Sequence, residues 1–175
     1  MEHQKSNVIA GKAHKYGDNI DTDVIIPGRY CNMTDPQALA QHCLEDLDAT
    51  FVEKVLQNDI VVAGDNFGCG SSREVAAVTL KAAGVGAVIA NSFARIFFRN
   101  CINLGLPIIE CPECVENIDT GDEIEINLSA GQIHNKTKDK NFTFAPYIAE
   151  LTEIFDAGGL IPWLKKQTEK ENTND

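Results

Sequence analysis

The sequence contains 175 residues, which is enough for one domain with a substantial core and short for two. Lys and Arg number 15 against 26 Asp and Glu, which gives a formal net charge of −11. This acidic balance argues against nucleic-acid binding, because phosphate contacts need clustered Lys and Arg. We find no stretch near the ~20 apolar residues that span a bilayer and no signal-peptide core, so we expect a cytoplasmic protein.

The cysteines lie within apolar, core-like segments, and in a reducing compartment we expect them to be free thiols. They are Cys31, Cys43, Cys69, Cys101, Cys111 and Cys114. The last two form a CxxC pair, but no second pair or nearby histidine completes a zinc set. We therefore interpret that pair as structural thiols, with a metal or redox site as the less favoured alternative.

The first third of the chain predicts one strand, an Asp-rich loop and two helices. Residues 7–16 read as a strand and turn. The acids of residues 18–23 resemble a calcium loop, but the later Gly and Glu of such a loop are missing, so we expect Asp side chains to accept hydrogen bonds from nearby backbone N–H groups. Asp35 and Pro36 predict a helix start with apolar residues up to Leu44, and residues 48–57 predict a second short helix.

The stretch 64–74 (Gly-Asp-Asn-Phe-Gly-Cys-Gly-Ser-Ser-Arg-Glu) follows a predicted buried strand, residues 59–63, and precedes a predicted helix, about 72–83. Its glycines allow positive φ angles and close approach of the backbone to a ligand. A helix that starts at its two serines would present unpaired backbone N–H groups, which suits an anion. The alternative is a serine N-cap with an incidental arginine.

Regular alternation follows. We expect a strand at 85–90, a helix at 93–103 capped by Asn91-Ser92, and a strand at 106–110. Strands and helices that alternate with short connections imply right-handed crossovers and a mainly parallel sheet. Ligands bind beyond the carboxyl ends of such strands, so the loops at 64–72 and 91–92 could face one cleft.

From Gly121 onward the hydrophobic period changes to two. Segments 122–128, 131–135 and 142–144 predict a small antiparallel β patch. Segments 148–156 and 160–166 predict helices, and the polar residues 167–175 a disordered tail. The predicted fold is therefore α/β: one domain over residues 1–166, with a parallel βαβ core and a small antiparallel β patch.

Several isolated residues could carry chemistry. Cys69 lies inside the glycine loop, but with no histidine to activate it a nucleophile is the minority interpretation. The histidines (His3, His14, His42 and His134) are dispersed and form no triad. Arg95 and Arg99 share a helix face. Arg99 could reach the cleft, with a solvated surface arginine equally favoured, and Arg29 has a better claim to a ligand-facing loop.

Ser71 and Ser72 need help to act as bases, because a free serine is a poor one. A helix N-terminus and the neighbouring Arg73 would stabilise an alkoxide electrostatically. That combination suits removal of a carbon-bound proton next to a carboxylate. Elimination of a hydroxyl also needs a Lewis acid, for which the sequence offers no ligand set. A complete hydratase would therefore require a partner.

Three segments, 19–27, 64–74 and 92–96, resemble the small subunit of the aconitase superfamily in order and spacing. The likeness covers about residues 7–166. It implies a swivelling β/β/α domain that closes over a separate large subunit carrying a [4Fe-4S] cluster, with no cofactor or metal on this chain. The implied reaction is dehydration to a cis-alkene diacid followed by rehydration, which moves the hydroxyl to the neighbouring carbon.

The resemblance also assigns roles. Ser71 would be the base, Arg73 would bind a substrate carboxylate, and Ser72 would contact substrate. Arg29 and Gly70 complete the predicted substrate-binding set. The loop Tyr30-Cys31-Asn32-Met33-Thr34 would select the substrate's side group. Many relatives carry His where this chain has Val75, which concerns packing more than catalysis.

Two hypotheses result. The leading one is a catalytic subunit of a heteromeric iron–sulfur hydro-lyase in leucine biosynthesis. Its substrate stays open between isopropylmalate, homocitrate or homoaconitate, methyl-substituted malates and citrate. The other is a non-catalytic module that binds di- or tricarboxylates. The sequence also leaves open whether the isolated chain forms a homo-oligomer.

Overall fold

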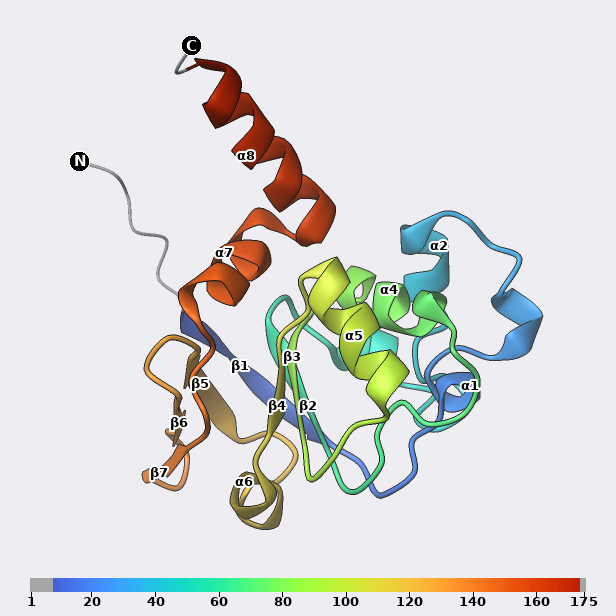
Figure 1. Cartoon of the computed structure of the whole chain (residues 1–175). Coiled ribbons are helices and arrows are strands. Elements are labelled where there is room, and N and C mark those ends of the chain that lie inside the picture. The colour runs from blue at the N-terminus through green and yellow to red at the C-terminus, as the bar shows by residue number, and fades with distance from the viewer. Residues whose placement is uncertain (1–7, 174–175) are drawn as a thin grey trace.

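A seven-stranded sheet forms the centre of the molecule, with strand order β4-β3-β2-β1-β5-β6-β7. The computed structural model describes residues 8–173. Figure 1 shows the four parallel strands beside the helices α4 and α5, with the antiparallel strands on the far side of β1. The strands are β1 (Val8–Lys15), β2 (Asp59–Ala63), β3 (Val85–Ala90), β4 (Ile108–Glu110), β5 (Glu123–Asn127), β6 (Gln132–Asn135) and β7 (Lys140–Thr143).

The long strand β1 joins a parallel half to an antiparallel half of the sheet. Its second half pairs in parallel with β2, from Ala13 opposite Ile60 to Lys15 opposite Val62. Its first half pairs antiparallel with β5, from Val8 opposite Asn127 to Lys12 opposite Glu123. The predicted βαβ core and antiparallel patch are therefore both confirmed, and they share one strand.

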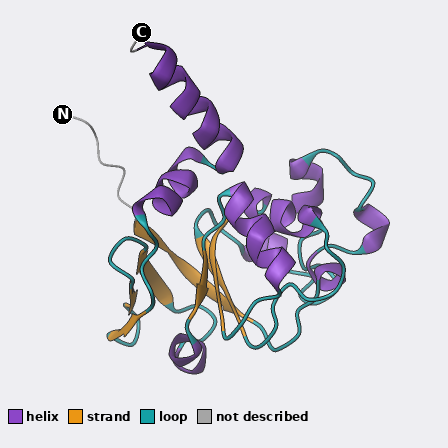
Figure 2. Ribbon diagram, viewed as in Figure 1, coloured by secondary structure: helices purple, strands orange, loops and turns teal. Residues whose placement is uncertain are grey.

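Helices cover the sheet and fill the connections (Figure 2). They are α1 (Thr22–Ile25), the 3-10 turn η1 (Gly28–Tyr30), α2 (Pro36–Ala40), α3 (Phe51–Lys54), α4 (Glu74–Ala82), α5 (Arg95–Leu104), α6 (Pro112–Asn117), α7 (Ala149–Ala157) and α8 (Leu160–Thr173). In the part of the chain that is described, no helix has both the length and the apolar composition to cross a membrane.

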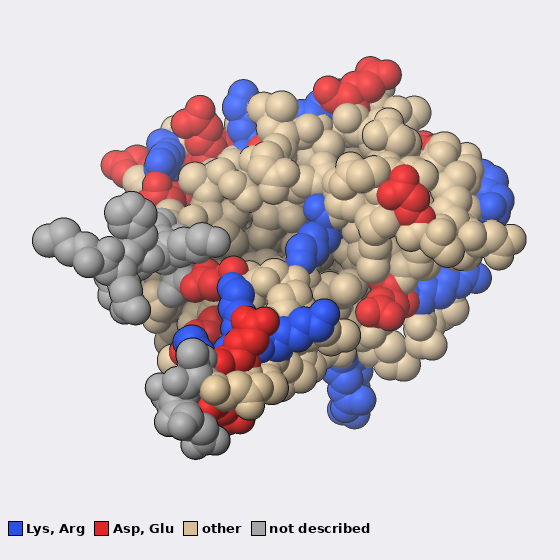
Figure 3. Space-filling view, turned by 90° about the horizontal axis from the view of Figure 1, so that it is seen from above, with Lys and Arg blue, Asp and Glu red and all other residues tan. Residues whose placement is uncertain are grey.

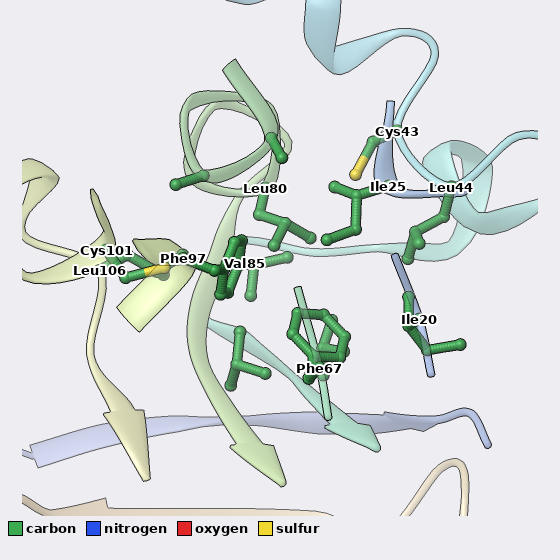
Figure 4. Packing of buried hydrophobic residues seen from close by; sticks show 14 of the residues in the cluster. Ile20, Ile25, Cys43, Leu44, Phe67, Leu80, Val85, Phe97, Cys101 and Leu106 are labelled. Carbon is green, nitrogen blue, oxygen red and sulfur yellow. The ribbon is translucent and has the colours of Figure 1, made fainter. Parts of the chain in front are cut away.

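Two hydrophobic clusters hold the layers together, one on each side of the parallel strands. The first contains the fully buried Phe67 and Leu80 and extends to Phe97 of α5. Figure 4 shows Leu80 pointing from its helix toward Val85 and the sheet. The second contains Ile60 of β2 and Ile89 of β3, together with residues of α6 and the antiparallel patch. The neighbours of these two residues along the strands, Val61 and Val88, point to the other face and belong to the first cluster. Such burial on both faces explains why β2 and β3 read as continuous apolar runs.

Several predicted helix bounds are wrong, and the backbone shows why. The predicted helix up to residue 44 ends at Ala40, since Leu44 has a left-handed φ of 56° and donates its N–H to Ile25 O. Helix α4 begins at Glu74 rather than at the serines, because Arg73, its N-cap, is extended. The helix predicted for 48–57 is the single turn Phe51–Lys54.

Two further expectations are corrected at the carboxyl-terminal side. Helix α8 continues through the segment predicted as a disordered tail to Thr173; residues 174–175 lie outside the described part. Cys111 and Cys114, predicted as free thiols, form a disulfide with their Cα atoms 5.3 Å apart. The helix start at Pro112 brings these positions within the range that a disulfide spans. Cys31, Cys43, Cys69 and Cys101 are free thiols, as predicted.

Candidate functional site

The three loops that leave the carboxyl ends of β1, β2 and β3 lie side by side. The loop after β1 donates Asn19 N–H to Asp65 O at 2.8 Å and Thr22 N–H to Cys69 O at 2.9 Å. In return, Gly68 N–H donates to Ile20 O at 2.8 Å. The Asp-rich segment and the glycine loop, far apart in sequence, thus pair along their lengths.

The loop after β3 joins the other side of the glycine loop. Phe67 N–H donates to Ser92 O at 3.0 Å, and Ala94 N–H donates to Phe67 O at 2.9 Å. Phe67 and Phe93 form an isolated parallel bridge there. The three sequence segments that resemble the aconitase superfamily are therefore neighbours around one strand end, as expected for a ligand site in a parallel sheet.

Glycine is required at Gly68. Its φ is +79°, and a Cβ at this position would lie 2.1 Å from Cγ of the Phe97 ring. The absence of a side chain therefore lets the first turn of α5 pack directly against the glycine loop. Gly70, directly before Ser71, also has a left-handed φ, +96°, a conformation that favours glycine.

A cavity of about 200 Å³ lies between the N-terminal ends of α4 and α5. Its lining comes from the glycine loop, α1 and α5: Thr22, Gly68, Gly70, Ser71, Ser72, Arg73, Ala94, Arg95, Ile96, Phe97 and Asn100. Neither helix has a side-chain N-cap, so the N-terminal N–H groups of both lack that partner. Two positive helix ends and two arginines make the cavity suited to an anion.

Ser71 lies exposed at the cavity, within reach of one other hydroxyl. Thr22 Oγ1 donates to Ser71 O at 3.0 Å and lies 3.4 Å from Ser71 Oγ. Ser71 precedes the N-cap Arg73 by two residues, and Arg73 N–H donates to Ser71 O at 2.8 Å. Ser71 therefore lies outside α4, which weakens the predicted role of the helix N–H groups. The arginines that line the same cavity, Arg73 and Arg95, are the other candidates to stabilise a serine alkoxide.

Arg73 lines the cavity and contacts two earlier parts of the chain, the Asp-rich segment and the predicted specificity loop. Its Nη1 donates to Asp23 Oδ1 at 2.6 Å and lies 3.3 Å from Cys31 Sγ. A Cβ on Gly28 would lie 3.3 Å from the same nitrogen. The segment 28–31 therefore borders the arginine that the sequence assigned to a substrate carboxylate.

Arg29 does not line this cavity. Its guanidinium binds both oxygens of Asp46, at 2.7 and 3.1 Å, and Glu45 Oε1 at 2.6 Å. These acceptors hold the pKa of Arg29 above its ordinary value. Tyr30 stacks on His42 with ring centroids 3.7 Å apart. The predicted specificity loop is thus attached to the 42–46 turn on its outer side.

The structure also separates residues that the sequence left undecided. Arg95 lines the cavity, whereas Arg99 lines a different hollow with Phe98 and Tyr147. Burial raises the pKa of the Cys69 thiol and the carboxylate of Asp21 raises it further, which disfavours a thiolate nucleophile.

Thr22, Arg95 and Asn100 were not among the predicted site residues. Thr22 and Arg95 belong to the matched segments, and each follows directly on a loop that leaves a parallel strand, which is the signal that could have found them. Asn100 carries no such signal, because it lies one turn further along α5.

The described residues bring no set of metal ligands together at this site. Within residues 8–173, no group of three or more His, Cys, Asp and Glu side chains could hold a metal ion. His14 and His134 each contact an aspartate, Asp59 and Asp139. His3 lies outside the described residues. The residues described here therefore do not fit an iron–sulfur cluster.

The fold and the site together define a class. The model of the aconitase C-terminal domain family matches residues 8–114. The chain belongs to this family, and the swivelling-domain fold predicted from the sequence is confirmed.

Its relatives include named hydro-lyase subunits. The "3-isopropylmalate dehydratase small subunit" of Caldicellulosiruptor saccharolyticus is 58% identical over 94% of this chain and 95% of the relative. The "2,3-dimethylmalate dehydratase small subunit" of Eubacterium barkeri is 54% identical over 91% of this chain and 98% of the relative. A crystal structure titled 3-isopropylmalate dehydratase, from Methanocaldococcus jannaschii, superposes with a TM-score of 0.89 at 46% identity, over 96% of this chain and 99% of that one.

Proposed function

We propose that this chain is the small subunit of a 3-isopropylmalate dehydratase, a hydro-lyase that interconverts 2-isopropylmalate and 3-isopropylmalate in leucine biosynthesis. The observation that carries the proposal is the cavity that contains Ser71, Ser72 and Arg73 between two uncapped helix N-termini. The relatives named for this activity, at up to 58% identity over nearly the whole chain, support the same conclusion.

Ser71 would be the base. In the dehydration direction its alkoxide would take the proton from the carbon next to a carboxylate and become the neutral serine. The hydroxyl of the neighbouring carbon would take a proton from an acid on the large subunit and leave as water. The product is a cis-alkene diacid, and rehydration in the opposite sense moves the hydroxyl. Arg73 would bind a carboxylate, and the charge of its guanidinium, more than the helix N–H groups, would favour the alkoxide over the neutral hydroxyl. Ser72 and Gly70 would contact substrate from the same loop.

The other half of the active site would lie on a large subunit. That partner would hold a [4Fe-4S] cluster, which supplies the Lewis acid for the departing hydroxyl. The present chain would close over it and exclude water with its apolar cavity wall, which includes Ile96 and Phe97. We place the complex in the cytoplasm, the compartment that we expect from the sequence.

For the side group of the substrate there is a second candidate, the methyl groups of 2,3-dimethylmalate. A relative named for 2,3-dimethylmalate is 54% identical, close to the 52–58% of those named for 3-isopropylmalate. The loop Tyr30-Cys31-Asn32-Met33-Thr34 would make this selection, because Cys31 contacts Arg73 at the cavity. A panel of substituted malates, including homocitrate and citrate, separates these substrates.

The test is anaerobic reconstitution with a large subunit, followed by turnover assays of wild type and Ser71→Ala. General-base catalysis contributes about 10²–10⁴-fold, so we expect Ser71→Ala to lose at least about a hundredfold in kcat while assembly is retained. A module that only binds di- or tricarboxylates would show no turnover in wild type, and Ser71→Ala would bind ligand as well as wild type does. Activity that survives Ser71→Ala would exclude Ser71 as the base.

A further inference from the structure

Arg95 is fixed at the cavity by the backbone around it. It is the first residue of α5, and the hydrogen bond from Ala94 N–H to Phe67 O ties the preceding residue to the glycine loop at 2.9 Å. The contact between Phe97 and Gly68 holds the same helical turn against that loop. The start of the Arg95 side chain is therefore set by the loop that carries Ser71.

The two arginines of the cavity differ in their partners. Arg73 already binds the carboxylate of Asp23 at 2.6 Å. Arg95 has an exposed side chain and makes no ion pair or hydrogen bond through its guanidinium within residues 8–173. In a chain with a net charge of −11, acids are abundant, yet none of those described covers this guanidinium.

We infer that Arg95 is a second carboxylate-binding residue: its guanidinium binds the substrate carboxylate that Arg73 does not hold. The inference rests on the proposed function, because a substituted malate carries two carboxylates. A guanidinium donates two parallel hydrogen bonds to a carboxylate, and the neighbouring Arg73 has committed part of its donors to Asp23. Two separate arginines on one cavity match a dicarboxylate, whereas one would suffice for a monocarboxylate.

Arg95→Gln in the reconstituted complex tests this, and Arg99→Gln is its matched control. Arg99 lies four residues further along α5 and lines another hollow, so its loss changes the charge of the helix equally but not the cavity. Hydrogen bonds to charged groups contribute about 1.5–3 kcal/mol, so we expect Arg95→Gln to raise KM by about 10–150-fold. Arg99→Gln should leave KM within about twofold, and Arg95→Lys should be intermediate because it keeps the charge and loses the fork.

The decisive measurement compares succinate with butyrate as competitive inhibitors, since butyrate has a methyl group where succinate has its second carboxylate. Wild type should bind succinate more tightly than butyrate, and Arg95→Gln should lose most of that difference. If the difference persists, or if Arg95→Gln only weakens assembly with the large subunit, the inference is overturned. Binding of the same two ligands by calorimetry reports on Arg95 even where the complex turns over no substituted malate, so failure of the proposed function is detected separately.

Discussion

Asp23 accepts a hydrogen bond from Arg73 at 2.6 Å, although Asp23 lies in α1, after β1, and Arg73 ends the loop that leaves β2. The same Arg73 nitrogen lies 3.3 Å from Cys31 Sγ. One guanidinium therefore connects the Asp-rich segment, the predicted specificity loop and the cavity. Asp23 and Cys31 both contact the same guanidinium nitrogen, Nη1 of Arg73. These contacts therefore fix the direction in which the other N–H groups of the guanidinium point.

Asp23→Asn should consequently impair substrate binding more than chemistry. The amide keeps the size of Asp23 but attracts the guanidinium less, so we expect KM to rise about tenfold with kcat within about threefold. The measurement is steady-state kinetics of the reconstituted complex. Residues in contact couple, so the variant that combines Asp23→Asn with Arg73→Lys should be no worse than Arg73→Lys alone. A KM lower than that of wild type would instead mean that Asp23 competes with the substrate.

The contacts of Arg29 predict that it orders the loop beside the cavity. Arg29→Gln should speed hydrogen exchange at the backbone N–H groups of Tyr30, Cys31 and Met33 by about threefold, the scale of exposed ion pairs. The charge swap Arg29→Glu with Asp46→Arg should restore slow exchange. Lys136→Gln, which removes another partly exposed ion pair, that with Glu125, should leave the exchange of these N–H groups unchanged. An unchanged rate in Arg29→Gln would contradict the prediction.

Patterns in the sequence predicted the sheet and the loop that lines the cavity, because such patterns report local properties. The apolar runs at 59–63 and 85–90 are strands, and the loop that follows the first lines a cavity. The sequence patterns could not show whether Arg95 or Arg99 lines the cavity. Helical spacing puts both on one face, but which end of that face meets the cavity depends on the contact between Phe97 and Gly68.

Arg29 lies away from the cavity for a related reason. Its position after an apolar run indicated a ligand-facing loop, but the acids that bind it, Glu45 and Asp46, follow a turn with Leu44 in a left-handed conformation. A buried leucine at positive φ costs energy locally and persists only where tertiary packing compensates. Sequence periodicity predicts that the helix continues to Leu44. A chain leaving such a helix would not be expected to bring Glu45 and Asp46 to Arg29.

The buried Asp59 predicts a specific pH dependence of stability. Burial would raise its pKa, but hydrogen bonds from His14 and from the N–H groups of Leu56 and Lys12 outweigh burial and lower the pKa below the ordinary 3.8. A carboxyl whose pKa is lower in the folded state stabilises it above the unfolded pKa, and this stabilisation is lost as pH falls through the folded value.

Asp59→Asn should therefore destabilise the chain by about 1–3 kcal/mol at pH 7, since an amide cannot accept all of these bonds. The difference from wild type, measured by urea unfolding, should shrink as the pH falls below about 4. Asp139→Asn is the control, because Asp139 is exposed and lies at a positive φ that asparagine tolerates. A difference that stays constant between pH 7 and pH 3 would rule out the titration of Asp59 as its source.

Gly68→Ala should disrupt both the fold and the site. The new Cβ would lie 2.1 Å from the Phe97 ring at a φ of +79°, so the first turn of α5 must move away or the loop must change conformation. Overpacking and the unfavourable φ together should cost at least about 2 kcal/mol in urea unfolding.

Gly17→Ala provides the comparison, because a Cβ there meets nothing within 4 Å and should change stability by less than about 0.5 kcal/mol. The displaced turn begins at Arg95, so Gly68→Ala should also raise the KM of the reconstituted complex under conditions in which the variant remains folded. If Gly68→Ala unfolds at the same urea concentration as Gly17→Ala, the close packing of α5 on the glycine loop does not determine the geometry of the cavity.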